Sequence, residues 1–164
     1  MKNLHALLFA LILFFACHVA MASEKQFSLY SPDKRTEVKI TLGDKIEYSM
    51  LHNGKILLTP SPISIEYING TIIGSKPTLI KQKSLTVNGE VKPLYGQNAV
   101  IKEKYNELSL SFKGNYSVIF RAYNEGVAYR FITSSKEPLT IKNEEATFAF
   151  PGNYKGYYKP DYEF

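Results

Sequence analysis

The sequence predicts an all-β protein folded as an antiparallel β-sandwich. Apolar and polar residues alternate along nearly the whole chain after residue 22, which is typical of strands with one buried face. Gly, Pro, Asn and Asp interrupt these segments at short intervals, as they do in turns. No segment shows a convincing helical spacing of apolar residues. Roughly a dozen short strands in one domain predict two packed sheets.

The first 22 residues have the pattern of a signal peptide. A positive start at Lys2 precedes an uncharged apolar run over 7–15, and Ala20-Met21-Ala22 supplies the small residues that signal peptidase recognises. The run is short for a membrane span, and no stop-transfer segment follows it. We therefore expect cleavage after Ala22, no membrane span, and export. An uncleaved N-terminal anchor and a lipoprotein acylated on Cys17 are the alternatives.

Cleavage would leave few residues for metal or thiol chemistry. Cys17 is the only cysteine and would leave with the signal, as would His5 and His18. The mature chain then has no disulfide and no cysteine nucleophile, and His52 is its only histidine. The formal net charge of +5 comes from lysines and arginines scattered between apolar residues. A nucleic-acid-binding protein concentrates such residues on one stripe, so no nucleic-acid partner is expected.

The first expected strands span 26–30, 36–42 and 45–51, separated by turns at Ser31-Pro32-Asp33 and Gly43-Asp44. Asn53-Gly54 tolerates the positive φ of a tight hairpin turn, so 56–59 should return beside 45–51. Pro60-Ser61-Pro62 should then end that strand.

The middle of the chain is less regular. A strand is expected over 63–68, followed by a loose surface connection to Pro77. Another strand over 79–87 reaches Asn88-Gly89, which predicts a turn and a return through 91–95. A further extended segment is expected over 99–104.

The last part has the clearest alternation. Strands are expected over 105–112, 116–123, 127–132 and, before Pro151-Gly152, 147–150. The expected core residues are Leu110, Phe112, Phe120, Tyr129 and Phe131. Gly126 is expected to be an obligatory turn glycine in the left-handed region.

The block 120–131 contains the first candidate chemistry. Arg121 and Arg130 are candidates to bind an anion or sugar hydroxyls, with Glu125 as an acid. The favoured alternative is a hairpin whose arginines pair with carboxylates on the polar face.

Aromatic residues gather at the C-terminus. Tyr157 and Tyr158 are weak candidates to stack on sugar rings, because a pyranose presents apolar C–H faces. The favoured alternative is that these aromatics pack against something outside this chain.

The carboxylates make poor catalytic pairs. Glu144 and Glu145 are neighbours and would point to opposite faces of a strand, whereas glycoside hydrolysis needs two carboxyl groups facing one bond. Asp161 and Glu163 can face the same way, but calcium takes six to eight oxygen ligands. A solvated tail is the favoured alternative. His52 precedes a turn with no visible partner, so a catalytic role for it is not expected.

The stretch Phe120-Arg-Ala-Tyr-Asn-Glu-Gly-Val-Ala-Tyr-Arg-Phe131 closely resembles the signature of the N-terminal domain of glycoside hydrolase family 97. Shorter pieces agree in order, including Ser31-Pro32-Asp33, Ser61-Pro62-Ile63 and Thr147-Phe148-Ala149-Phe150-Pro151. The resemblance extends from about Ser31 to Pro151, and the twelve-residue block is its specific part.

The resemblance implies an exported bacterial enzyme, periplasmic or extracellular, that hydrolyses α-glucosides or α-galactosides. It implies a sandwich of the galactose-mutarotase-like (super-sandwich) type over 23–151, and the start of a linker toward a (β/α)₈ catalytic barrel over 152–164. The catalytic carboxylates of the family lie on the barrel, so no catalytic residue is expected in this chain. The family's calcium ion takes most of its ligands from the barrel and one from the N-terminal region, for which Glu163 is the candidate.

We therefore expect the N-terminal, carbohydrate-binding-type sandwich of an α-glycosidase, inactive by itself, with α-linked oligosaccharide and the catalytic barrel as partners. No cofactor is expected for this chain alone. The alternatives are a stand-alone exported carbohydrate-binding module and an exported structural or adhesion domain.

Overall fold

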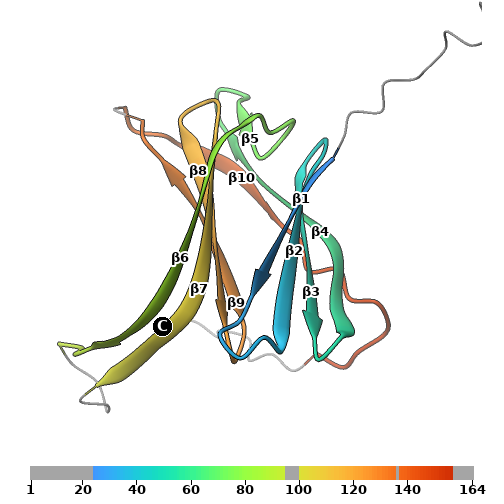
Figure 1. The fold of residues 1–164 in the computed structure, drawn as a ribbon. Helices are drawn as coiled ribbons and strands as arrows, with labels where there is room; N and C mark the ends of the chain where they lie inside the picture. The colour runs from blue at the N-terminus through green and yellow to red at the C-terminus, as the bar shows by residue number, and fades with distance from the viewer. Residues whose placement is uncertain (1–23, 95–99, 136, 157–164) are drawn as a thin grey trace, which may run out of the picture.

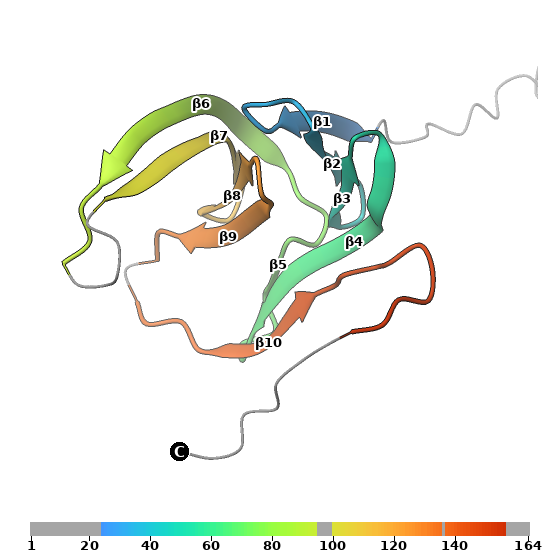
Figure 2. The same cartoon turned by 90° about the horizontal axis from the view of Figure 1, so that it is seen from below.

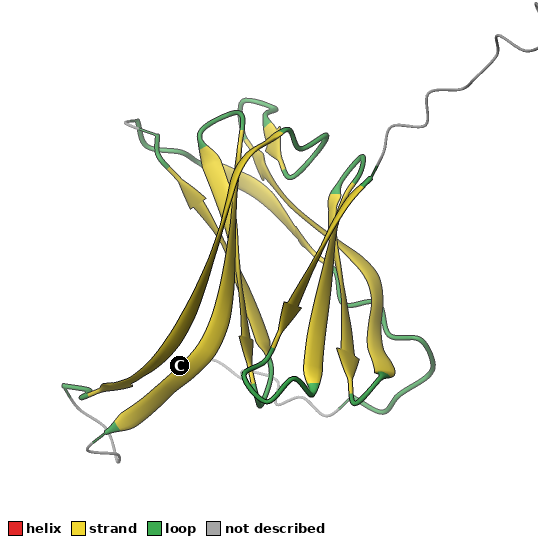
Figure 3. Ribbon diagram, viewed as in Figure 1, coloured by secondary structure: helices red, strands yellow, loops and turns green. Residues whose placement is uncertain are grey.

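A computed structural model describes residues 24–94, 100–135 and 137–156, and this part contains ten strands and no helix (Figure 3). The strands are β1 Lys25–Tyr30, β2 Thr36–Leu42, β3 Ile46–His52, β4 Lys55–Tyr67, β5 Ile72–Ile73, β6 Leu79–Val91, β7 Ile101–Phe112, β8 Tyr116–Tyr123, β9 Val127–Thr133 and β10 Ile141–Ala146. The predicted signal peptide over 1–22 lies outside the described residues. Among those that are described, no helix is long and apolar enough to cross a membrane.

The strands form two antiparallel sheets that face each other (Figures 1 and 2). One sheet has the order β1-β2-β3-β4-β10, with the short β5 also paired to β4. The other has the order β6-β7-β8-β9. Viewed from below, the strands surround a common centre, and β9 and β10 lie on either side of the open part of the ring (Figure 2). The predicted all-β sandwich is confirmed.

The core lies between the sheets and follows the alternation in the sequence. Every second residue of β2 is buried, and the same holds along β8. Leu110, Phe112 and Phe120 are buried, as predicted. Tyr129 and Phe131 are only partly buried and pack against the edge of this core. Their partial exposure arises because β9 is the last strand of its sheet.

The expectation for Gly126 was wrong. Its φ is not positive, and a Cβ added there would meet no atom within 4 Å. The glycines that do take a positive φ include Gly54, in the predicted tight hairpin, and Gly74. Asn53 and Gly54 have φ of 49° and 77°, as a hairpin with two left-handed turn residues requires.

The predicted strand break at Pro60-Ser61-Pro62 was also wrong, because β4 runs through it. Pro62 pairs with Glu47 of β3, whereas Pro60 lies where the register between β3 and β4 shifts between Tyr48 and Met50. A proline is tolerated there because the ladder does not require its missing N–H. Ser61 is fully buried, and its Oγ donates to the carbonyl of Thr59 at 2.8 Å.

The turn predicted at Asn88-Gly89 does not exist. Both residues lie inside β6, opposite Lys104 and Glu103 of β7. The two segments predicted over 99–104 and 105–112 are one strand, β7. A long β6–β7 ladder therefore outweighs the local turn preference of Asn-Gly.

The strand predicted over 147–150 is absent, and β10 forms just before it. Residues 147–149 still bond to β4: the N–H of Thr147 donates to the carbonyl of Pro62, and the N–H of Thr59 donates to that of Ala149. β10 escaped prediction because its sequence, Ile-Lys-Asn-Glu-Glu-Ala, is mostly polar and lacks alternation.

Candidate functional site

A cluster of aromatic and charged side chains lies on the face of β7 and β8 that points away from the core. Nε of Arg121 donates to Oε2 of Glu107 at 2.7 Å. The guanidinium of Arg121 lies 4.4 Å from the ring centroid of Tyr105, within range of a cation–π interaction. The ring of Tyr105 is also 5.0 Å from that of Tyr123. We call these four residues the arginine–tyrosine cluster.

The local sequence explains why these residues meet. The β7–β8 hairpin closes at Gly114-Asn115, both with positive φ. This closure places Glu107 opposite Arg121 and Tyr105 opposite Tyr123. Sequence reasoning selected Arg121 but missed Glu107 and Tyr105. The signal was available, since a hairpin centred on Gly114 fixes these cross-strand pairs.

The cluster holds charge but offers no proton donor suited to catalysis. The hydrogen bond that Arg121 donates to Glu107 raises the pKa of Arg121 above its ordinary value, against the smaller opposing effect of burial. The guanidinium therefore stays charged. A shallow hollow of about 110 Å³ lies beside it, between Arg121, Tyr123 and the exposed Arg130. Glu125 is exposed. For Arg121, the alternative of pairing with a carboxylate is confirmed.

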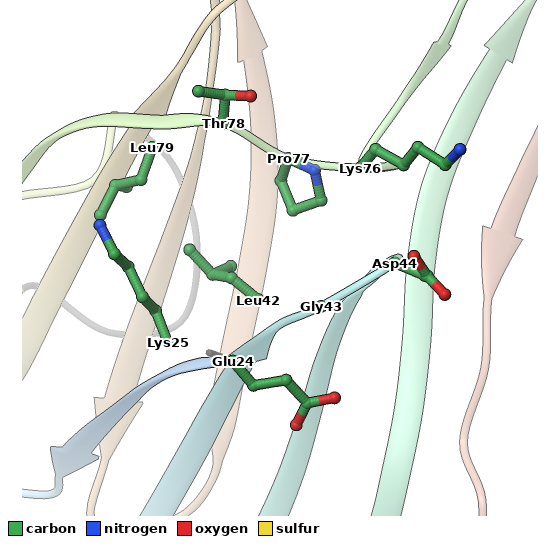
Figure 4. A pocket seen from close by; sticks show the side chains of 9 residues that line it. All are labelled: Glu24, Lys25, Leu42, Gly43, Asp44, Lys76, Pro77, Thr78 and Leu79. Atoms are coloured by element: carbon green, nitrogen blue, oxygen red, sulfur yellow. The ribbon is translucent and has the colours of Figure 1, made fainter. Parts of the chain in front are cut away.

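A hollow of about 550 Å³ lies where the start of β1, the β2–β3 turn and the β5–β6 connection meet (Figure 4). Its charged side chains are Glu24, Lys25, Asp44 and Lys76. Figure 4 shows these groups along the rim rather than converging on one point. No aromatic side chain lines it. The hollow thus lacks the stacking surface and the convergent polar groups of a built ligand site.

Two described carboxylates, Glu145 and Asp33, have shifted pKa values, and both pKa values are lowered. Glu145 accepts hydrogen bonds from Nζ of Lys45 at 2.7 Å and Oγ of Ser64 at 2.8 Å, and these lower its pKa. Hydrogen bonds from Ser31 and Arg35 lower the pKa of Asp33 to about 2. A glycosidase acid needs a raised pKa.

His52 is better connected than the sequence suggested. It is half-buried, and its Nδ1 lies 3.0 Å from Oγ1 of Thr36, the residue opposite it in the β2–β3 ladder. Thr36 itself is almost fully buried. The expectation that His52 has no partner was therefore wrong, and this contact gives it a structural role at the end of the ladder.

Tyr157, Tyr158, Asp161 and Glu163 lie outside the described residues. Within the described ranges, no group of three or more His, Cys, Asp or Glu side chains could hold a metal ion. Calcium takes six to eight oxygen ligands, so the described residues do not fit a complete calcium site.

The comparisons with known proteins agree with one another. A family model described as glycosyl-hydrolase 97 N-terminal matches residues 29–164. The chain is 36% identical over 153 residues to a retaining α-galactosidase of Bacteroides thetaiotaomicron, an alignment that covers 93% of this chain and 22% of that protein.

Solved structures share the fold. A glycoside hydrolase family 97 enzyme from a Pseudoalteromonas species, in complex with panose, matches with a TM-score of 0.67 and 21% identity over 76% of this chain and 20% of its own. A β-arabinopyranosidase matches with a TM-score of 0.68 and 22% identity over 77% of this chain and 22% of its own. The chain thus spans about a fifth of the length of these relatives.

Proposed function

Because the chain belongs to the glycosyl-hydrolase 97 N-terminal family, we propose that it is the N-terminal, carbohydrate-binding-type sandwich of an exported α-glycosidase. One observation carries this proposal: the family model spans 29–164, while the alignment spans only 22% of the relative. The catalytic groups would then be supplied by the other four-fifths of such an enzyme. The chain's own role is to support that part and to contact its substrate.

The carboxylates of the described residues support a role without bond cleavage. Glu144 and Glu145 point to opposite faces of β10, since Glu144 pairs with Ile65 and Glu145 with Ser64 of β4. Glu107 is paired with Arg121, and Glu66 with Lys142. Hydrolysis needs an unpaired acid and a second carboxylate across the same glycosidic bond.

The relatives support α-linked oligosaccharide as the substrate class. The curated relative is named for its action on α-galactosides, and a solved relative binds panose. In this chain Tyr157 and Tyr158 are the proposed contacts. Tyrosine rings suit the apolar C–H faces of a sugar, and their hydroxyls can bond to its polar groups.

The proposal can be tested with the purified chain lacking residues 1–22. We expect no hydrolysis of p-nitrophenyl α-glucoside or α-galactoside. We expect hydrolysis when the chain is fused to the part of the Bacteroides thetaiotaomicron enzyme that follows the aligned segment. Hydrolysis by the chain alone would overturn the proposal. Tight panose binding by the chain alone, without any activity of the fusion, would favour the stand-alone binding module.

We also propose that the complete enzyme binds calcium and that this chain supplies one of the ligands. Glu163 is the proposed ligand from this chain, and its carboxylate would complete a site whose other ligands come from the catalytic part. When bound there, calcium would supply positive charge beside the substrate. Because one carboxylate cannot hold the ion, adding calcium or EDTA to the isolated chain should leave its melting temperature unchanged. A calcium-dependent rise of several degrees would show a site within this chain.

A further inference from the structure

The two sides of the sandwich are closed differently. Beside β1 the sheets are joined by hydrogen bonds: Nδ2 of Asn106 donates to the carbonyl of Tyr30 at 2.8 Å, and the N–H of Asp33 donates to Oδ1 of Asn124 at 3.1 Å. Beside β9 and β10, no hydrogen bond joins the two strands within the described ranges. Each of them pairs with a neighbour on one side only.

A mainly apolar cleft of about 340 Å³ opens at this unjoined side. Its apolar lining comes from Ile65 and Tyr67 of β4, Phe131 of β9, Leu139 just before β10 and Ile141 at its start. Its polar lining consists of Thr133, Ser135 and Glu137. Ile65 and Tyr67 are buried, whereas Leu139 and Ile141 are 40% and 57% exposed. The inter-sheet core therefore continues into a partly uncovered apolar surface, which in a folded protein marks an interaction site.

β9 is an unprotected sheet edge. Its sequence, Val-Ala-Tyr-Arg-Phe-Ile-Thr, contains a single charged residue and no proline, and no register shift interrupts its pairing with β8. Among the other outer strands, β1 also contains a single charged residue, Lys25, but the carbonyl of Tyr30 at its end is bonded to Asn106 of the opposite sheet. β6 and β10 carry the usual protection against edge pairing. β6 contains Lys81, Lys83 and Glu90, while β10 contains three charged residues and a register shift after Ile141.

We propose that the free edge of β9 is where an extended polypeptide segment of the longer family 97 enzyme adds as a further strand. The segment's main chain would pair with β9, and every second side chain would enter the cleft over Phe131, Ile65 and Ile141. Such strand addition combines main-chain hydrogen bonds with pockets for alternate side chains. This inference rests on the proposed function, since the segment comes from the four-fifths of the relatives that the chain does not match.

The chemistry of the surface favours a strand over the other occupants. A sugar needs convergent polar groups, whereas five of the eight lining residues are apolar or aromatic and the polar ones, Thr133, Ser135 and Glu137, are exposed. A strand uses both features of the surface, the unpaired edge and the apolar cleft. It would also cover Ile132, which is 40% exposed on the opposite face of β9.

The experiment supplies the other part of the enzyme as a separate polypeptide. The probe is the Bacteroides thetaiotaomicron α-galactosidase from which the aligned segment has been removed, co-produced with this chain. Hydrogen exchange of β9 amides is measured with and without the probe. Complex formation is compared between the parent chain, Thr133→Lys and Gln26→Lys. Thr133 lines the cleft and is exposed, so the lysine should leave the isolated fold stable; Gln26→Lys adds the same charge at the exposed β1 edge.

The proposal expects protection of β9 amides in the complex, complex affinity lowered at least about tenfold by Thr133→Lys, and affinity within about twofold for Gln26→Lys. A complex with unprotected β9 would overturn the docking edge while leaving the proposed function intact. Absence of any complex would overturn this inference. The proposed function would still be tested separately, by the hydrolytic activity of the fusion protein. Protection of β9 by self-association of the chain alone, measured by light scattering, would assign the edge to a second copy.

Discussion

Asp33 organises the turn between β1 and β2 with both of its carboxylate oxygens. Oδ1 accepts from Oγ of the buried Ser31 at 2.6 Å and from the N–H of Arg35 at 3.0 Å. Oδ2 accepts from Nε of Arg35 at 2.6 Å. The resemblance had singled out Ser31-Pro32-Asp33 as a matching piece, and the structure shows a physical reason for the aspartate: its charged form holds the turn.

The hydrogen bonds to Asp33 make the stability of the fold depend on pH. They lower its pKa from 3.8 to about 2, so the stabilisation is complete above about pH 4 and is lost as the pH falls through about 2. In Asp33→Asn this contribution is absent at every pH. We expect the parent chain to melt at a higher temperature than the variant at pH 6, and the two melting temperatures to converge near pH 2. A constant difference between pH 6 and pH 2 would contradict this assignment.

The Glu107–Arg121 pair should contribute more than a surface pair. The side chains of Glu107 and Arg121 are 13% and 28% exposed, against 27% and 59% for Glu66 and Lys142. Glu107→Gln should lower the free energy of unfolding by about 1–2 kcal/mol, between the usual values for exposed and buried pairs. Glu66→Gln is the matched control and should cost less than about 0.5 kcal/mol. Urea denaturation of both variants checks this, and equal losses would refute it.

At the scale of the elements, the backbone conformation of the segment after β5 requires a glycine at position 74. Gly74 has a φ of 94°, and an added Cβ would lie 2.7 Å from the carbonyl oxygen of Ile63. Its N–H donates to the hydroxyl of Tyr116 at 3.3 Å, and its carbonyl accepts from the N–H of Ile46 at 2.9 Å. Because Tyr116 belongs to the opposite sheet, Gly74 helps to join the two layers.

Gly74→Ala should therefore destabilise the fold by about 2 kcal/mol or more, from the left-handed backbone and the clash with β4. Gly126→Ala provides the control, because its φ is not positive and space is open around it; its cost should stay below about 1 kcal/mol. Thermal or urea unfolding of the two variants measures the difference. Similar losses for both would contradict the geometry.

The elements with a regular apolar alternation were predictable from the sequence. Val38, Ile40 and Leu42 define the buried face of β2, and Val118, Phe120 and Ala122 that of β8. These faces are buried between two sheets, so the pattern of side chains and the burial coincide. The arginine–tyrosine cluster was half predictable, since Arg121 was selected and its partner Glu107 follows from the register.

The errors have a common physical cause: long-range pairing outweighed local preference. Asn88-Gly89 is a strong turn sequence, yet it lies in a ladder that pairs β6 with β7 up to Val91 and Ile101. The sequence of β10 lacks apolar alternation, because the neighbours Glu144 and Glu145 put a charged residue on each face of the strand. The strand forms because β4 supplies its main-chain partners. The cleft beside β9 depends on the position of β10, so it could not be predicted either.

For the whole molecule, the burial of side chains differs between the centre of the β6–β9 sheet and its β6 edge. β8 lies centrally and has alternate residues buried. β6 is exposed on both faces along nearly its whole length, with only Leu79 and Val87 partly buried. A strand held by a ladder without side-chain burial has little to stabilise it against local opening.

We therefore expect the isolated chain to open locally at β6 before it unfolds. The β6 amides that bond to β7 should exchange with deuterium on the order of a hundredfold faster than those of β2, whose alternate residues are buried. The β7 amides of residues 101–104, which are mostly exposed, should exchange with β6, whereas those near Leu108 and Leu110 should stay protected. Residue-resolved hydrogen exchange by NMR checks the order. Equal protection of β6 and β2 would show that the β6–β7 ladder is stable without a covering layer, and the sandwich would then open as a single unit.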